Sequence, residues 1–228
     1  HYAWHTAGGD DIAINVLWLG DDIEINNNSR SEVAGSVDSS TYVWVKWDSA
    51  PTPDLVANTL VSMAVVKNDR EGQVERTGQA SGTLHDHREF QVYSMQRHYQ
   101  YVPDDAWLLA FGADYRYASA EYESASHVQF APAFAALGGT TGPRDTVVDL
   151  TLQGHQFAAF ANLKRRITRR ITTEFGLRLD GQEDAYRRDL QFSPRFSLRF
   201  EPLRGTAIRY GWGRYSQATG LHELHVFD

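Results

Sequence analysis

Hydrophobic and polar residues alternate along much of the chain, most clearly from Trp107 to Tyr117. One face of this segment would carry Trp107, Leu109, Phe111, Ala113, Tyr115 and Tyr117, and the other Gly112, Asp114 and Arg116. An amphipathic helix needs apolar residues three or four positions apart, whereas a strand repeats every two residues. The pattern, which is rich in aromatic residues, therefore predicts a β-strand with one apolar and one polar face.

The same period of two recurs in other segments. It is found in residues 12–18, 171–180, 195–200 and 208–213, and residues 55–65 read as one long strand. Residues 42–47 and 90–101 also predict strands, although their pattern leaves open which side chains face which way. About nine or ten strands are predicted in all.

Two kinds of connection alternate along the chain. Short turns are predicted at 47–55, 101–107, 165–169 and 200–206, three of them containing Pro. Longer polar connections are predicted at 20–40, 68–87, 121–153 and 181–191. Antiparallel strands joined in this way would have tight turns at one end of the sheet and long loops at the other.

This arrangement is typical of outer-membrane proteins. We therefore predict an all-β fold, part of an antiparallel up-and-down transmembrane β-barrel, in which one strand face meets lipid and the other the lumen. Trp47, Tyr101 and Trp107 lie beside short turns, and Tyr115, Tyr117 and Tyr122 lie about a membrane's thickness away, as two aromatic girdles require. A soluble sheet rich in aromatic residues is the alternative, because aromatics favour strands in any setting.

Composition narrows the possible classes. The chain has no Cys, which excludes disulfides, thiolate metal sites and cysteine nucleophiles. A net charge of -7, with 22 basic residues scattered among 29 acidic ones, does not favour nucleic acid as a partner. No window approaches the roughly 18 apolar residues of a membrane-spanning helix. The mean hydropathy of -0.47 leaves a barrel possible, because its strands need apolar side chains only at alternate positions.

Motifs for catalysis or metal binding are weak. His222 and His225 flank Glu223, but a zinc protease needs its histidines four residues apart on a helix. His85 and His87 could hold a metal, yet a solvated loop is the favoured interpretation. The basic residues between 164 and 170 lie at a predicted turn, where contact with solvent or lipid headgroups is favoured over nucleic acid. The sequence thus predicts neither a catalytic nor a metal site.

The candidate ligand-facing residues are the charged ones on the predicted lumen face, where substrate contact and mere solvation both remain open. They are Asp114, Arg116, Glu174, Arg178, Arg199 and Arg209, with Arg195 on the same predicted face. Gly211 and Gly213 are expected to relieve crowding on that face.

Three sequence blocks resemble a known family. They are HQFAAFANLKRRITRRITTEFGLRLD (155–180), SPRFSLRFEP (193–202) and GWGRYSQATGLHEL (211–224). These blocks are similar to successive hairpins of TonB-dependent outer-membrane receptors, and the likeness extends over most of the chain from about Tyr42. It implies that residues 1–228 are a fragment of the receptor barrel, which in this family has about 22 strands, with the plug domain and the C-terminal strands absent.

The resemblance also implies a function. A receptor of this family lies in the bacterial outer membrane and binds a scarce nutrient, such as a ferric siderophore, at its extracellular loops. Import is energised by TonB, ExbB and ExbD through the plug, and neither a cofactor nor enzymatic activity is expected. The expected partners are outer-membrane lipid, this complex and a small-molecule substrate, with the 121–153 loop as the best candidate for ligand contact. The alternatives are a passive pore or adhesin barrel, and a soluble β-rich binding module.

Overall fold

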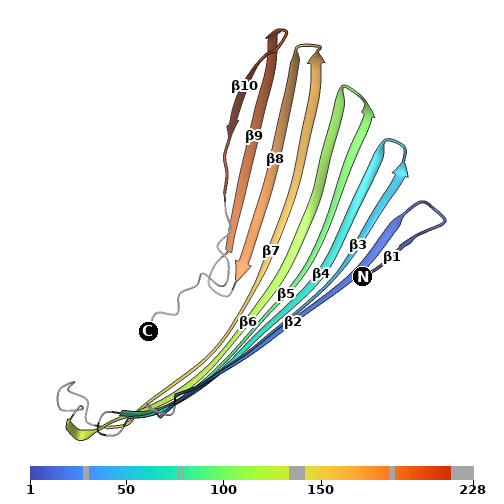
Figure 1. Cartoon of the computed structure of the whole chain (residues 1–228). Helices are drawn as coiled ribbons and strands as arrows, with labels where there is room; N and C mark the ends of the chain where they lie inside the picture. The colour runs from blue at the N-terminus through green and yellow to red at the C-terminus, as the bar shows by residue number, and fades with distance from the viewer. Residues whose placement is uncertain (28–30, 77, 79, 134–141, 185–187, 217–228) are drawn as a thin grey trace.

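The computed structural model describes residues 1–27, 31–76, 78, 80–133, 142–184 and 188–216. Within them lie ten β-strands (Figure 1). They are β1 (Tyr2–His5), β2 (Asp11–Asn27), β3 (Glu32–Thr52), β4 (Leu55–Arg76), β5 (Ala80–Asp104), β6 (Trp107–Phe130), β7 (Arg144–Thr168), β8 (Ile171–Asp184), β9 (Arg188–Leu203) and β10 (Thr206–Gly213).

The ten strands form one sheet in the order of the sequence, and each pairs antiparallel with the next. This is the predicted all-β, up-and-down fold, and the sheet is open, with β1 and β10 at its edges. Figure 1 shows the hairpins side by side and the whole sheet bending along the length of its strands. Within the described residues there is no helix long and apolar enough to cross a bilayer.

Strand register makes the two faces continuous across the sheet. Phe111 pairs with Tyr99 on β5 and with Ala161 on β7, so the apolar residues of neighbouring strands share one face. The same register settles the facing that the sequence left open, because it places Trp47 and Tyr99 on this side. We call it the apolar face, and the opposite one, which carries Asp114 and Arg116, the polar face.

The strands extend far beyond the predicted ones, which corrects the long loops expected at one end. Residues 20–40, 68–87 and 181–191 belong mostly to paired strands, and β6 and β7 continue to Phe130 and from Arg144. The connecting segments are 28–31, 77–79, 131–143 and 185–187. At about 3.3 Å per residue, the 25 residues of β5 span roughly 80 Å.

The loop prediction was too generous because it relied on hydrophobic alternation. In these residues neither face is continuously apolar, so the alternation that marks a strand in the sequence is missing. Hydrogen bonding to neighbouring strands alone can then maintain the strand, and polar cross-strand pairs such as Arg76 with Glu32 accompany it. We call the part of the sheet made by β2–β7 beyond the apolar segments the extension.

The short turns lie where the sequence predicted them. Residues 53–54, 105–106, 169–170 and 204–205 connect β3 to β4, β5 to β6, β7 to β8 and β9 to β10. Gly205 has a φ of 83°, a conformation that glycine adopts without steric cost. All four turns lie at one end of the sheet, the short-turn end, and the extension lies at the other (Figure 1).

Candidate ligand-facing surface of the sheet

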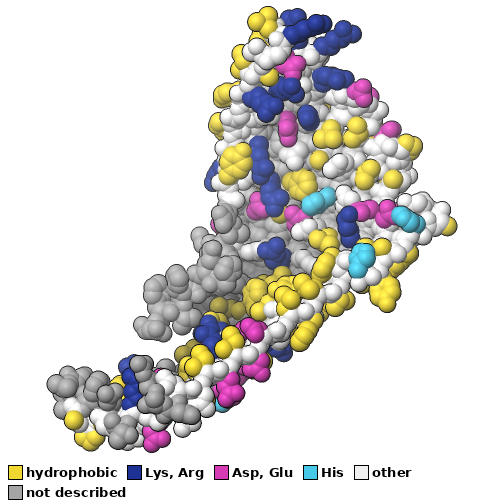
Figure 2. Space-filling model, viewed as in Figure 1, with side chains coloured by type: hydrophobic (Ala, Val, Ile, Leu, Met, Phe, Trp, Pro, Cys, Tyr) yellow, Lys and Arg dark blue, Asp and Glu magenta, His cyan; other side chains and the backbone are white. Residues whose placement is uncertain are grey.

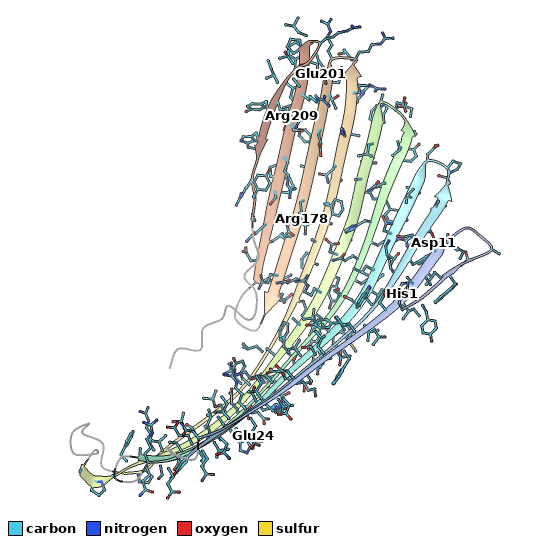
Figure 3. All side chains as sticks on the ribbon, in the orientation of Figure 1. His1, Asp11, Glu24, Arg178, Glu201 and Arg209 are labelled. Carbon is cyan, nitrogen blue, oxygen red and sulfur yellow. The ribbon has the colours of Figure 1, made fainter. Side chains whose placement is uncertain are left out.

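All six sequence-predicted candidates lie on the polar face. The register places Asp114 opposite Ala158, Ala158 opposite Asp180, and Arg178 opposite Ser193, so β6 to β9 contribute side chains to one surface. Figure 2 shows charged side chains of both signs, together with histidines, over the broad part of the sheet. Figure 3 places Arg178 partway along the strands and Arg209 nearer the short-turn end. The candidates therefore divide into two groups.

The first group surrounds a hollow of about 410 Å³ on the polar face. Asp114, Arg116 and Arg178 line it together with amide side chains, including those of Gln96, Gln156 and Gln191. The Arg178 guanidinium lies 3.6 Å from the Asp114 carboxylate and 2.9 Å from that of Asp180. Because the Ala158 side chain between β6 and β8 is small, Arg178 can reach across β7 to Asp114.

Arg116 differs from Arg178 in having no ion pair or hydrogen bond to another described side chain. Its guanidinium charge is therefore open to an external acceptor, whereas the charge of Arg178 is shared between two carboxylates. Together with the amide groups, this surface can hold a polar ligand through several hydrogen bonds.

The second group lies nearer the short turns. Glu174, Arg199 and Arg209 line a larger hollow of about 790 Å³ with Lys164 and Arg166. Arg199 forms an ion pair with Glu201, while Glu174 and Arg209 have none among the described residues. The basic residues of 164–170 lie on both faces of the sheet. Lys164 and Arg166 face this hollow, while the guanidinium of Arg165, on the apolar face, lies 4.2 Å from the Trp107 ring centroid. This end of the polar face carries charges of both signs, because Asp104, Asp105 and Glu201 line the same hollow.

The sequence did not single out His98, whose ring nitrogen lies 2.6 Å from the Asp114 carboxylate. The same imidazole makes an edge contact with Phe160, with ring centroids 5.0 Å apart. Residues 90–101 alternate poorly, so no sequence pattern placed His98 on the polar face. Its connection to Asp114 comes from the β5–β6 register, which a single sequence does not reveal.

A second cluster missed by the sequence continues the polar face into the extension. The Asp86 carboxylate is 6% exposed and lies 2.8 Å from Arg88 and 3.4 Å from Arg70. Arg88 also lies over the ring of Tyr122, at 4.5 Å from its centroid. Because Asp86 was expected in a loop, its neighbours across the strands could not be inferred.

On the other side of the extension, histidines pair with acids across strands. His87 with Asp69 and His127 with Asp145 are hydrogen bonded, and His85 lies 3.5 Å from Glu71. His85 and His87 therefore belong to β5, which corrects the loop expected there. No group of three or more possible metal ligands occurs among the described residues, and His222 and His225 lie outside them.

The His87–Asp69 pair gives the extension a pH dependence. The hydrogen bond to Asp69, supported by the negative charges of Asp69, Glu123 and Glu89, raises the pKa of His87 above its usual value near 6.5. A raised folded-state pKa means that the pair contributes stability fully below about pH 6.5 and loses it as pH rises through the raised value.

We therefore expect amide hydrogen exchange of β4 and β5 in the extension, corrected for its intrinsic pH dependence, to accelerate as pH rises through this range. In His87→Gln this acceleration of exchange with pH should be absent. Lys67→Gln is the control, because it removes a neighbouring ion pair with Glu89 but leaves the imidazole in place. Identical pH profiles for the wild type and His87→Gln would contradict the prediction.

No protein-family model matches the chain, and no curated protein sequence matches it either. Solved structures do resemble it. The siderophore receptor PiuA from Acinetobacter baumannii superposes with a TM-score of 0.58 at 10% identity, over 88% of this chain and 39% of that one. The RagAB peptide importer in its closed-closed state gives a TM-score of 0.55 at 9% identity, over 80% of this chain and 23% of that one. The chain therefore spans well under half of either neighbour, and at these identities the similarity establishes that it has the fold of a section of β-barrel wall.

Proposed function

We propose that this chain forms part of the barrel wall of an outer-membrane receptor that binds and imports a nutrient. The observation that carries the proposal is the register, which keeps one face apolar from β2 to β10 and collects ionic and amide groups on the other. A sheet with a broad exposed apolar face needs lipid or another apolar partner. The structural neighbours, a siderophore receptor and a peptide importer, support the transport role.

In the proposed mechanism no covalent bond is made or broken. The nutrient, a ferric siderophore or a related chelate, is captured at the end of the sheet that carries the extension. It then moves along the polar face, where Arg116 offers an unpaired guanidinium and the Arg178 ion pairs can exchange partners. TonB, ExbB and ExbD would supply the energy for import by acting on a plug domain elsewhere in the parent protein.

The test uses the full-length protein in cells whose uptake of radiolabelled ferric chelates of hydroxamate, catecholate and citrate type is measured. We expect Arg116→Gln to lower uptake of at least one chelate roughly tenfold, because hydrogen bonds to charged groups contribute about 1.5–3 kcal/mol each. Lys67→Gln is the control, because it also removes one positive charge but lies on the opposite side of the sheet from Arg116.

Each alternative predicts a different result. Uptake that survives both an uncoupler and deletion of TonB would indicate a passive pore. Binding without uptake would indicate an adhesin. A full-length protein that stays monomeric without detergent would indicate a soluble binding module and would overturn the membrane assignment.

A further inference from the structure

One charged residue lies among the apolar side chains of the apolar face. Four successive cross-strand rows on β3–β9, from the row of Tyr101 to the row of Met95, contain a single Lys, Arg, Asp or Glu among the described residues, which is Arg97. An arginine on a face surrounded by apolar side chains is costly unless its charge is matched. The groups around Arg97 should therefore indicate which group balances its charge.

Arg97 is held by a small structure built from three strands. Its guanidinium hydrogen bonds to the Thr59 hydroxyl and lies over two rings, 4.9 Å from the Trp47 centroid and 5.0 Å from that of Tyr99. Ala57 and Thr59 on β4 are buried, at 0% and 8% exposure. The small side chains of β4 thus leave room for the guanidinium between the aromatic rings of β3 and β5.

Both rings are themselves fixed. Tyr99 stacks on Phe111 with centroids 4.9 Å apart and ring planes 11° apart. The Trp47 indole donates a hydrogen bond of 3.0 Å to the Asp10 carboxylate. The guanidinium is therefore positioned in advance, and a bound group would not have to pay for ordering it.

No carboxylate completes this arrangement. Among the described residues, Arg97 has no ion pair, and only one of its five N–H groups is used by Thr59. The guanidinium carbon lies over both rings, and the remaining N–H groups have no partner among the described side chains. Asp10 accepts the Trp47 indole instead. The partner that Arg97 lacks is therefore an anion with two or more oxygens in one plane, which is the geometry that guanidinium groups bind best.

The position of Arg97 in the sheet indicates where that anion comes from. Trp47, in the same cross-strand row, pairs with Ile12 just after the turn between β1 and β2, and Asp10 of that turn accepts its indole N–H. Tyr101 lies near the end of β5, before the β5–β6 turn. Aromatic residues at such positions lie at the level of lipid headgroups, and a long arginine side chain can reach that level from within the apolar layer. The ligand would thus enter from the bilayer.

We propose that Arg97, Thr59, Trp47 and Tyr99 form a binding site for the phosphate of an anionic glycerophospholipid in the leaflet at the short-turn end. The proposal rests on the membrane location in the proposed function but does not depend on the transported substrate. Phosphate recognition favours a lipid without a compensating ammonium group. Zwitterionic lipid should bind more weakly at the same site.

The test is native mass spectrometry of the full-length protein in detergent with phosphatidylglycerol or phosphatidylethanolamine added. We expect the wild type to retain phosphatidylglycerol preferentially, and Arg97→Gln to weaken its binding roughly tenfold, as loss of a charge-assisted contact implies. Arg97→Lys, which keeps the charge but loses the planar fork and the ring stacking, should give an intermediate result. Lys67→Gln, on the same side but beyond the apolar rows, should bind as the wild type does.

Equal phosphatidylglycerol binding by the wild type and Arg97→Gln would overturn the proposal. So would an equal loss in Arg97→Gln and Lys67→Gln, which would indicate general charge attraction, or a partner protein that dissociates from Arg97→Gln while lipid retention is unchanged. If Arg97→Gln does not assemble, Arg97→Lys supplies the comparison. A wild type that retains neither lipid would also overturn the proposal. A full-length protein that stays monomeric without detergent would instead overturn the proposed function, so the two failures can be recognised separately.

Discussion

Val61→Arg is expected to destabilise the full-length protein in a bilayer by about 2–4 kcal/mol, the cost of a guanidinium at the middle of the lipid-facing side of a barrel strand. Val61 lies on the apolar face between Val45 and Met95 and is 46% exposed. The nearest residues in the rows beside it on β3, β4 and β5 carry no carboxylate; they are Val43, Met63, Tyr93, Trp47, Thr59 and Arg97. The unfolding midpoint in urea, followed by tryptophan fluorescence in vesicles, measures the effect.

Ser62→Arg is the matched control, because the next residue on β4 points to the other face. Ser62 forms a 2.6 Å hydrogen bond with Ser94, and its loss costs about 1 kcal/mol. The new arginine would face the polar side, where water can solvate it. If both variants lose the same stability, or if Ser62→Arg loses more, the assignment of the apolar face to lipid is wrong.

Gly112→Val is expected to destabilise the sheet by about 1–3 kcal/mol through overpacking. A Cβ at Gly112 would lie 2.6 Å from the Arg97 carbonyl oxygen and 2.7 Å from the His98 ring. The carbonyl belongs to the backbone of the neighbouring strand and cannot move aside alone. The His98 ring would be displaced, and with it the hydrogen bond to Asp114.

Gly211→Val is the control for this second prediction. It lies on the same face at the edge strand β10, and a Cβ there meets nothing within 4 Å. We expect a change of about 0.5 kcal/mol or less, as for most exposed substitutions. Urea midpoints of the two variants measured side by side test the difference, and a Gly112→Val protein as stable as Gly211→Val would show that β5 and β6 can separate freely.

Strand identity could be predicted from the sequence because period two survives wherever one face is apolar. Residues 107–117 and 171–180 are examples, and each lies inside an observed strand. The fold class and the short turns followed from the same pattern. The full lengths of β4 and β5 could not be predicted, because in the extension both faces are polar and the alternation that marks a strand disappears.

The candidate site could be predicted only in part. Alternation was enough to assign Asp114 and Arg178 to one face, but their proximity depends on the register of β6, β7 and β8 and on the small side chain of Ala158. Relief of crowding was expected at both Gly211 and Gly213. It is wrong at Gly211, where the space for a Cβ is open, whereas a Cβ at Gly213 would lie 3.2 Å from the Arg195 side chain. The most crowded backbone contact is at Gly112, which no local pattern distinguishes from other glycines in strands.

The length of the paired strands changes how a ligand can be captured. A disordered loop closes over its target by losing conformational entropy, which costs about 1–2 kcal/mol for each residue that becomes ordered. In the extension most of that ordering is complete before any ligand arrives, because β4 and β5 remain hydrogen bonded from Leu55 and Tyr101 to Arg76 and Ala80. Such hairpins behave as stiff levers, so movement at their tips has to come from bending of the whole sheet. Force applied to the wall near the short turns would then be felt at the tips, about 80 Å away along the strand.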